Sequence, residues 1–210
     1  MKKTLILLAA MLLAISTFAA ETNSPAADAE AKYTAAINGR TADILKILAL
    51  TDADKAAKVR DTIIAQYRSL KAWHEENDAK LKTAKADTNA VAQIRGSLKT
   101  LHASFLARLA ENLSPEQIEQ VKDKMTYGKV QFTFAGYASQ YPGLSAANRQ
   151  KILELLKQAR EEAMDGGSAA EKTAVFTKCK GKINNFLSKQ GIHPEKAKAT
   201  APATNSVPLP

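Results

Sequence analysis

The sequence has one cysteine, nine glycines and seven prolines in 210 residues. A single cysteine excludes a disulfide framework and a cysteine-rich zinc module. So few glycines and prolines argue against a β-sandwich or barrel, which needs many tight turns. Aromatic residues make up only 6% of the chain, but hydrophobic residues make up 45%. This apolar content is enough for one folded domain with its own core, so we do not expect a disordered chain.

Motifs for catalysis and for metal binding are also missing. The chain has no Gly-x-Ser-x-Gly elbow, no phosphate-binding glycine loop and no Asp-rich calcium loop. Its histidines, His74, His102 and His193, are far apart, and none belongs to a His-Glu-x-x-His pair. Cys179 lies in an apolar helical stripe, which favours a buried side chain over a nucleophile. We therefore predict no cofactor and no metal site. A lyase that uses Tyr, His or Lys as its base stays open, but the sequence favours a protein without catalytic activity.

The first residues have the pattern of an export signal. Two lysines precede the run 4–15, which is apolar apart from one threonine, and small residues follow it. This order is typical of a secretory signal peptide, and the run is too short for a membrane-spanning helix. Thr17 and Ala19 favour cleavage after Ala19. No later run is long enough to cross a bilayer, so we expect a periplasmic or secreted protein without a transmembrane segment.

The remaining chain shows apolar residues at helical spacing and clear helix starts. The segment Leu113-Ser114-Pro115-Glu116-Gln117 is a capping box with proline at the first helical position, and Ser168-Ala169-Ala170-Glu171 is a second capping box. We expect Gly166 and Gly167 to end a helix by allowing a left-handed residue. Only Val130, Phe132 and Phe134 alternate as a strand would. The pattern predicts an all-α fold, a single helical-bundle-like domain of about six helices.

The composition divides the chain into four parts. They are a signal peptide at 1–19, an N-terminal helical arm at 20–41, a helical domain at 42–192 and a disordered tail at 193–210. Gly39 is expected to separate the arm's helix from the next apolar segment. The tail is rich in Ala, Pro, Thr and Lys and has no apolar period.

Two clusters of residues are candidates for ligand binding. Trp73, His74 and Asn77 bring polar groups onto the inward face of an apolar stripe, where they either form internal hydrogen bonds or face a cleft. Tyr127 and Tyr137 belong to an aromatic-rich segment between 127 and 141. Aromatic faces with hydroxyl groups suit sugar rings, although the spacing in this segment also fits an ordinary core stripe.

A third group of polar residues lies at the margins of the last two helical stripes. It consists of Arg160, Lys180, Asn184 and Asn185. We hypothesise that these residues meet Trp73 in one pocket, where Arg160 would bind a sugar carboxylate or hydroxyl pair and the amides would supply further hydrogen bonds. The alternative is an internal hydrogen-bond network that ties the helices together.

The formal net charge of +9 favours acidic partners. Several lysines share the last helix, and a basic surface attracts polyanions such as acidic polysaccharides or an anionic membrane surface. A solvated lysine face remains the simpler explanation. Nucleic acid is not an expected partner, because no nucleic-acid-binding motif is present.

Three segments resemble a known protein family. They are Met125-Thr126-Tyr127-Gly128, the run 159–168 (Ala-Arg-Glu-Glu-Ala-Met-Asp-Gly-Gly-Ser), and Lys180-Gly181-Lys182-Ile183-Asn184-Asn185-Phe186-Leu187. They resemble an exported bacterial family of unknown function, common in Bacteroidetes, that is provisionally labelled as sugar-binding and accompanies genes for plant-polysaccharide degradation. The resemblance covers about 42–192; Cys179 departs from it, because an aromatic residue is common there. The family provides no established functional residues to carry over.

The resemblance implies a carbohydrate-binding protein, whose ligand would be an acidic plant polysaccharide, without catalysis and with a role in polysaccharide utilisation. The alternative is a periplasmic structural or chaperone-like helical bundle that binds partner proteins through an apolar face. An extended exposed apolar surface without a polar pocket would favour this alternative.

Overall fold

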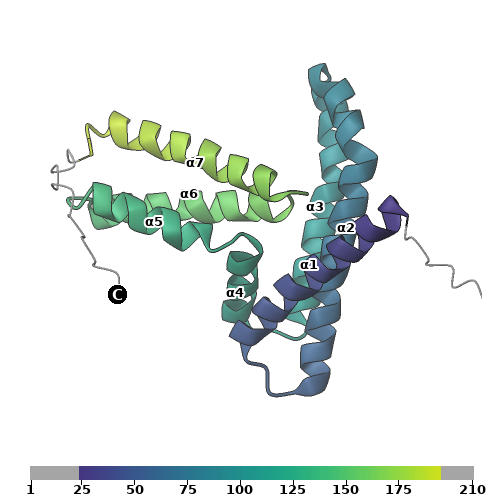
Figure 1. Cartoon of the computed structure of the whole chain (residues 1–210). Coiled ribbons are helices and arrows are strands. Elements are labelled where there is room, and N and C mark those ends of the chain that lie inside the picture. Colours follow the sequence, from purple (N-terminus) through teal and green to yellow (C-terminus); the bar gives the residue numbers. More distant parts are fainter. Residues whose placement is uncertain (1–23, 195–210) are drawn as a thin grey trace, which may run out of the picture. The chain divides into compact units, whose positions relative to one another are not determined.

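The computed structural model describes residues 24–194, and these residues are all-α (Figure 1). No strand occurs among them. Seven α-helices follow one another, with a short 3-10 turn at Ala84–Ala86: α1 (Pro25–Leu48), α2 (Ala53–Thr83), α3 (Thr88–Ala110), α4 (Pro115–Met125), α5 (Lys129–Gln140), α6 (Ala146–Met164) and α7 (Ala169–Lys189). The predicted all-α fold is confirmed. The expected signal peptide and nearly all of the expected tail lie outside the described residues.

The chain divides by its internal contacts into a unit of residues 1–35 and a unit of residues 36–210. Of the first unit the structure describes only 24–35, the opening turns of α1. There Pro25 is the first helical residue, and the side chain of Ser24 accepts a hydrogen bond from the amide of Ala27 at 3.3 Å. The features described below all lie in the second unit.

The expected break at Gly39 does not occur, because α1 continues through it. Its buried residues, Ile37, Thr41, Ile44 and Leu48, keep one helical face on both sides of the glycine. A glycine inside a helix costs only about 1 kcal/mol relative to alanine, which the burial of two or three such side chains outweighs.

The predicted capping boxes are formed to different extents. At the start of α4, the side chain of Ser114 accepts from the amide of Gln117, and the amide of Ser114 donates to the Gln117 side chain at 3.0 Å. At the start of α7, the side chain of Ser168 accepts from the amide of Glu171 at 3.1 Å. However, the Glu171 carboxylate accepts from the amide of Gly167 at 2.9 Å instead of from Ser168. The second box is therefore half formed.

Gly166 and Gly167 do not end α6 in the way the sequence suggested. Among the described glycines, positive φ angles occur at Gly128 and Gly191 and not at these two positions. Position 167 instead has no room for a side chain, since a Cβ atom on Gly167 would lie 2.7 Å from Cγ of His74. The end of α6 is capped by the buried Lys172, whose ammonium donates to the carbonyl oxygen of Met164 at 3.1 Å.

One hydrophobic core is formed by α5, α6 and α7, which pack on one another in sequence order (Figure 1). Its members include Tyr137, Leu156 and Phe176, and Cys179 is buried among them with its sulfur 3.3 Å from the carbonyl oxygen of Leu155. Cys179 is therefore a core residue, as predicted. The pair α2 and α3 also packs together, and α4 contacts both α3 and α6. None of the helices within residues 24–194 combines the length and apolarity needed to span a membrane.

Candidate functional site

The predicted ligand-binding residues do not meet in one pocket. Trp73 and His74 line a groove whose other walls come from α3, α6 and α7, and Asn184 is not part of that lining. Tyr127 lines a different pocket, between α1, α2 and α4. Tyr137, Lys180 and Asn184 form a third group, and Asn185 is exposed on α7.

Tyr137, Lys180 and Asn184 form an internal contact between α5 and α7. The Tyr137 hydroxyl lies 2.7 Å from the side-chain oxygen of Asn184 and 3.1 Å from the carbonyl oxygen of Lys180. Burial of the ring raises the pKa of Tyr137 to about 12, so the hydroxyl keeps its proton and donates it to these acceptors. Tyr137 thus joins two helices and does not present its face to a ligand.

Trp73 and Asn77 are also satisfied inside the protein. The indole nitrogen of Trp73 donates to the hydroxyl of Ser97 at 2.8 Å, which connects α2 with α3. The Asn77 amide donates to the carbonyl oxygen of Trp73 at 2.9 Å. Because the Trp73 side chain is almost fully buried, it does not offer a stacking plane to a ligand.

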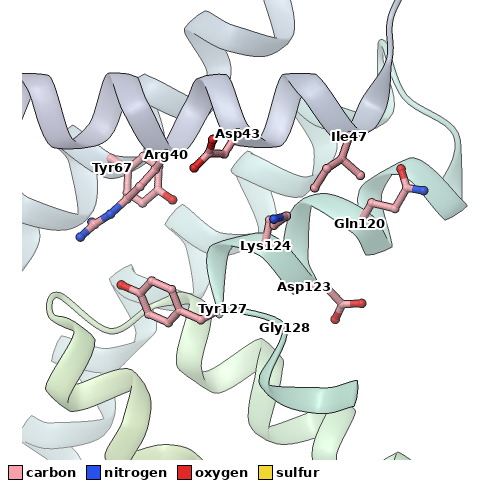
Figure 2. A pocket seen from close by; sticks show the side chains of 9 residues that line it. All are labelled: Arg40, Asp43, Ile47, Tyr67, Gln120, Asp123, Lys124, Tyr127 and Gly128. Carbon is pink, nitrogen blue, oxygen red and sulfur yellow. The ribbon is translucent and has the colours of Figure 1, made fainter. Parts of the chain in front are cut away.

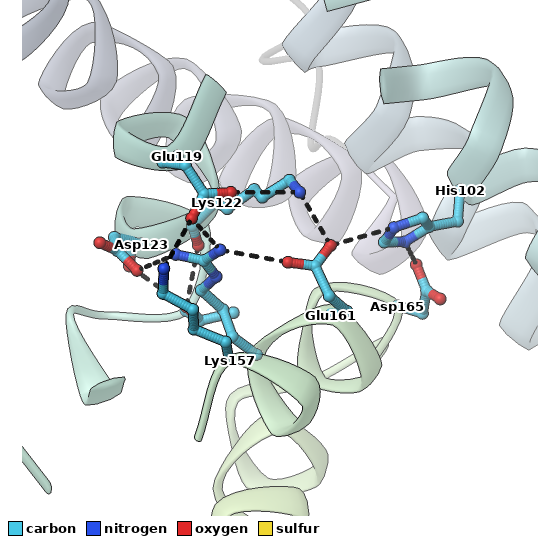
Figure 3. Close-up of polar contacts among 9 residues, drawn as sticks. His102, Glu119, Lys122, Asp123, Lys157, Glu161 and Asp165 are labelled. Carbon is cyan, nitrogen blue, oxygen red and sulfur yellow. Dashed lines mark hydrogen bonds and ion pairs between the residues drawn. The ribbon is translucent and has the colours of Figure 1, made fainter. Parts of the chain in front are cut away.

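Arg160 lies at the centre of a chain of alternating charges. Its carboxylate partners Glu119, Asp123 and Glu161 are labelled in Figure 3. The side chain of Arg160 is 3% exposed, and the guanidinium donates to Asp123 and Glu119, both at 2.6 Å, and to Glu161 at 3.2 Å. We call this set, extended through neighbouring residues, the charge network; its members are Glu119, Lys122, Asp123, Arg160, Glu161, His102 and Asp165. It joins α3, α4 and α6. Arg160 therefore belongs to an internal network, the alternative that the sequence left open.

The hydrogen-bond geometry determines the protonation states of His102 and Glu161 in the charge network. The two ring nitrogens of His102 face carboxylate oxygens, of Asp165 at 2.8 Å and of Glu161 at 3.4 Å. A carboxylate only accepts hydrogen bonds, so both nitrogens donate and the ring is an imidazolium. These bonds outweigh burial and raise the pKa of His102 to about 9. Burial raises the pKa of Glu161, but His102 and Lys122 reverse the effect and bring it to about 2.

The pocket around Tyr127, which we call the Tyr127 pocket, is built by an unusual helix end. The amide of Gly128 donates to the carbonyl oxygen of Asp123 at 2.8 Å, and the amide of Tyr127 donates to that of Lys124 at 3.1 Å. These two bonds define a Schellman motif, in which the residue at the Tyr127 position is usually glycine. Tyr127 adopts the left-handed conformation, with φ of 61°. For a bulky residue this costs about 1 kcal/mol.

The unfavourable backbone directs an aromatic ring into solvent. Tyr127 is 45% exposed, and its ring lies beside a pocket of about 460 Å³ (Figure 2). Arg40 and Asp43 reach the pocket from α1, and Gln120 and Lys124 reach it from α4. Within residues 24–194 these four side chains make no hydrogen bond or ion pair with one another or with other residues. They are thus available to a ligand.

The charge of the Tyr127 pocket is set by which of its groups are already paired. Asp123 also lines the pocket, but its carboxylate accepts from Arg160 at 2.6 Å. The groups that remain without a partner in the described chain are the cations Arg40 and Lys124 and the anion Asp43. The pocket therefore favours a ligand with a negative charge.

A second hollow, which we call the histidine groove, lies where α2 and α3 face the turn between α6 and α7. It measures about 740 Å³, and both His74 and His102 line it. His74 Nδ1 is 3.0 Å from the carboxylate of Asp78 and 3.9 Å from that of Glu171. Its Nε2 is 2.7 Å from the carbonyl oxygen of Asp165. In the described part of the chain, His74, Asp78 and Glu171 are a group able to hold a metal ion.

From the sequence, residues of both hollows were candidates for ligand binding. Tyr127 and His74 were among those candidates, but Arg40, Asp43 and Glu171 were not, and no metal ligand was predicted. The pairing of His74 with Asp78 is readable in the sequence, since residues four apart share a helix face. No local signal connects Glu171 or Asp165 to His74, because 91 residues separate His74 from Asp165.

Comparison with known proteins gives a family but no activity. No curated protein shows significant similarity to the chain. The chain belongs to the family described as "Protein of unknown function (DUF3826)", whose model matches residues 34–201.

Proposed function

We propose that this chain is an exported bacterial protein that binds carbohydrate without catalysis, and that the ligand, an acidic plant polysaccharide, binds at the Tyr127 pocket. The observation that carries the proposal is the backbone of Tyr127. A tyrosine stands where the helix end favours glycine, at a cost of about 1 kcal/mol, and its ring is exposed beside unpaired polar side chains. Strained, exposed residues of this kind concentrate at functional sites.

The side chains around Tyr127 provide what sugar binding requires. A sugar ring has a face of C–H groups that packs on an aromatic ring, while its hydroxyls need donors and acceptors in the same plane. The phenol ring supplies the packing surface. Arg40 and Lys124 supply donors, Asp43 supplies an acceptor, and the Gln120 amide supplies both.

The unpaired charges support an acidic sugar over a neutral one. A uronic acid carries one carboxylate for each ring, and a guanidinium binds a carboxylate through two parallel hydrogen bonds. Arg40 provides such a guanidinium, and Lys124 adds a second cation. The resemblance noted above, with its provisional sugar-binding label and its link to plant-polysaccharide degradation, supports the same class of ligand and export from the cell.

The alternative of a partner-protein surface has less support. Among the described residues, the exposed large hydrophobic side chains are Ile47, Tyr127 and Phe132. Ile47 and Tyr127 line the Tyr127 pocket together with the charged side chains of Arg40, Asp43 and Lys124. These residues do not make the extended apolar face that a chaperone-like bundle requires.

The test is calorimetric titration of the mature chain with oligogalacturonides and with neutral plant-wall oligosaccharides. The decisive variant is Tyr127→Gly, because glycine suits the left-handed backbone and removes only the ring. We expect it to weaken binding about ten-fold or more while the melting temperature stays the same or rises. Phe132→Ala is the matched control, since Phe132 is 79% exposed and lies outside the pocket lining.

Two results would contradict the proposal. One is the absence of saturable binding to any acidic or neutral oligosaccharide. The other is equal loss of binding in the Tyr127→Gly and Phe132→Ala variants, which would indicate nonspecific aromatic contacts. Saturable binding of unfolded polypeptides without sugar binding would favour the partner-protein alternative.

A further inference from the structure

We propose that the histidine groove holds a divalent transition-metal ion, bound by His74 Nδ1 and by the carboxylates of Asp78 and Glu171. The three ligand atoms lie within 4.8 Å of one another in the described structure. One imidazole and two carboxylates are a ligand set used for Zn²⁺ and for similar first-row ions. This site is separate from the Tyr127 pocket and does not depend on the proposed sugar binding.

Two of the ligands are placed by one helix. His74 and Asp78 are four residues apart on α2, so their side chains project from the same face, and the two atoms are 3.0 Å apart. Ligand atoms about 2.1 Å from a shared tetrahedral ion are about 3.4 Å from each other. The two atoms are therefore close to the spacing that a shared ion requires.

The third ligand comes from the first turn of α7. The Oε2 atom of Glu171 lies 3.9 Å from His74 Nδ1. The same oxygen accepts from the amide of Gly167 at 2.9 Å, which holds the carboxylate at the groove. A carboxylate that is itself hydrogen-bonded is the usual state of a metal ligand.

The orientation of the His74 ring is fixed from the opposite side. Its Nε2 is 2.7 Å from the carbonyl oxygen of Asp165, and a carbonyl only accepts, so Nε2 carries the hydrogen. Metal-bound histidines commonly donate their second nitrogen to a backbone carbonyl in this way, which leaves Nδ1 directed at the ion. Gly167 contributes by its size, since a Cβ atom would lie 2.7 Å from the ring.

The groove leaves room for further ligands on the ion. It holds about 740 Å³ of open space beside His74, enough for water or a small anion. Three protein ligands with an open position are typical of zinc sites that bind water or substrate. Because one ligand is a nitrogen, we expect tighter binding of Zn²⁺ than of Mg²⁺ or Ca²⁺, which prefer oxygen ligands.

Without an ion the same atoms form a plain hydrogen-bond network, in which Nδ1 donates to Asp78. The experiment separates the two states. Chelator-treated mature chain is titrated with ZnCl2 by calorimetry, and the thermal shift on adding Zn²⁺ is recorded. We expect one saturable site for each chain and a higher melting temperature, by mass action.

Asp78→Asn and Glu171→Gln each keep the shape of the side chain and remove a charged ligand. We expect each to weaken Zn²⁺ binding about ten-fold or more. Glu76→Gln on the exposed face of α2 is the carboxylate control, and His193→Gln is the histidine control; both should bind Zn²⁺ like the natural chain. Tyr127→Gly should also bind Zn²⁺ normally, so failure of the sugar proposal would not affect this result.

X-ray absorption spectroscopy of the Zn²⁺-loaded chain should show nitrogen and oxygen ligands at about 2.1 Å, with the signal of one imidazole. The proposal is overturned by lack of saturable binding at millimolar Zn²⁺. It is equally overturned by binding that Asp78→Asn and Glu171→Gln leave unchanged, which would place the ion elsewhere.

Discussion

Replacing His102 by glutamine tests how much the charge network stabilises the fold. The imidazolium of His102 bridges two carboxylates, those of Asp165 on one side and Glu161 on the other. Glutamine keeps a polar side chain of similar length but carries no charge. The variant therefore removes the charge of one network member and leaves its carboxylate partners in place.

The expected magnitude follows from the pKa of His102, which is raised from 6.5 to about 9. A shift of this size corresponds to at most about 3 kcal/mol of stability. Because the folded pKa lies above the unfolded one, this stabilisation is fully present below about pH 6.5. It is lost as the pH rises through about 9. His102→Gln should thus cost up to about 3 kcal/mol near pH 6 and close to nothing near pH 10.

The measurement is urea unfolding of the natural chain and of His102→Gln between about pH 6 and about pH 10. Other charged groups lie near His102: Arg95 and Lys99 line the same groove, and Lys122 also pairs with Glu161. The pKa of His74 is raised as well, because its hydrogen bonds to Asp165 and Asp78 outweigh the effect of burial. Because these groups are present in both proteins, the difference in unfolding free energy isolates His102. His193→Gln is the control. A difference that does not change with pH would refute the reasoning, as would an NMR titration that places the pKa of His102 at 6.5 or below.

Two further substitutions test specific contacts. Arg160→Ala should lower the unfolding free energy by about 1 to 3 kcal/mol in urea unfolding, because Asp123 and Glu119 lose their partner. An unchanged unfolding free energy would contradict this structural role. Gly167→Ala should lower the unfolding free energy by about 1 to 3 kcal/mol and shift the NMR signals of the His74 ring, because the added Cβ atom meets that ring. Gly143→Ala is the control and should do neither, since no atom lies within 4 Å of a Cβ atom at that position. Equal effects of the two substitutions would show that space is not limiting at Gly167.

Local patterns predicted most of the helices. The capping box at Ser114 and the stripe through Val59 and Ile63 depend only on residues within a few positions, so the sequence contains the whole signal. The break expected at Gly39 was wrong for a tertiary reason. The buried face of α1 on both sides of this glycine outweighs its low helix propensity.

The sites were predicted less completely, because their residues meet across long stretches of chain. Arg160 was expected at a pocket margin, but its partners Asp123 and Glu119 are 37 and 41 residues away. Similarly, the fit of Gly167 against His74 depends on how two helices pack, and no spacing within one helix reports it. Tyr127 was recognised as an aromatic residue, but its strained backbone becomes visible only with the helix end in place.

The charge network also bears on how long the folded state lasts. Helices that follow one another in the chain, such as α2 and α3 or α6 and α7, also pack together, and contacts of this local kind form rapidly. The bonds of Arg160 to Asp123 and of His102 to Asp165 instead close loops of 37 and 63 residues. Because long loops are closed late, we expect these ion pairs to be largely absent from the folding transition state. The charge network should therefore slow unfolding more than it speeds folding.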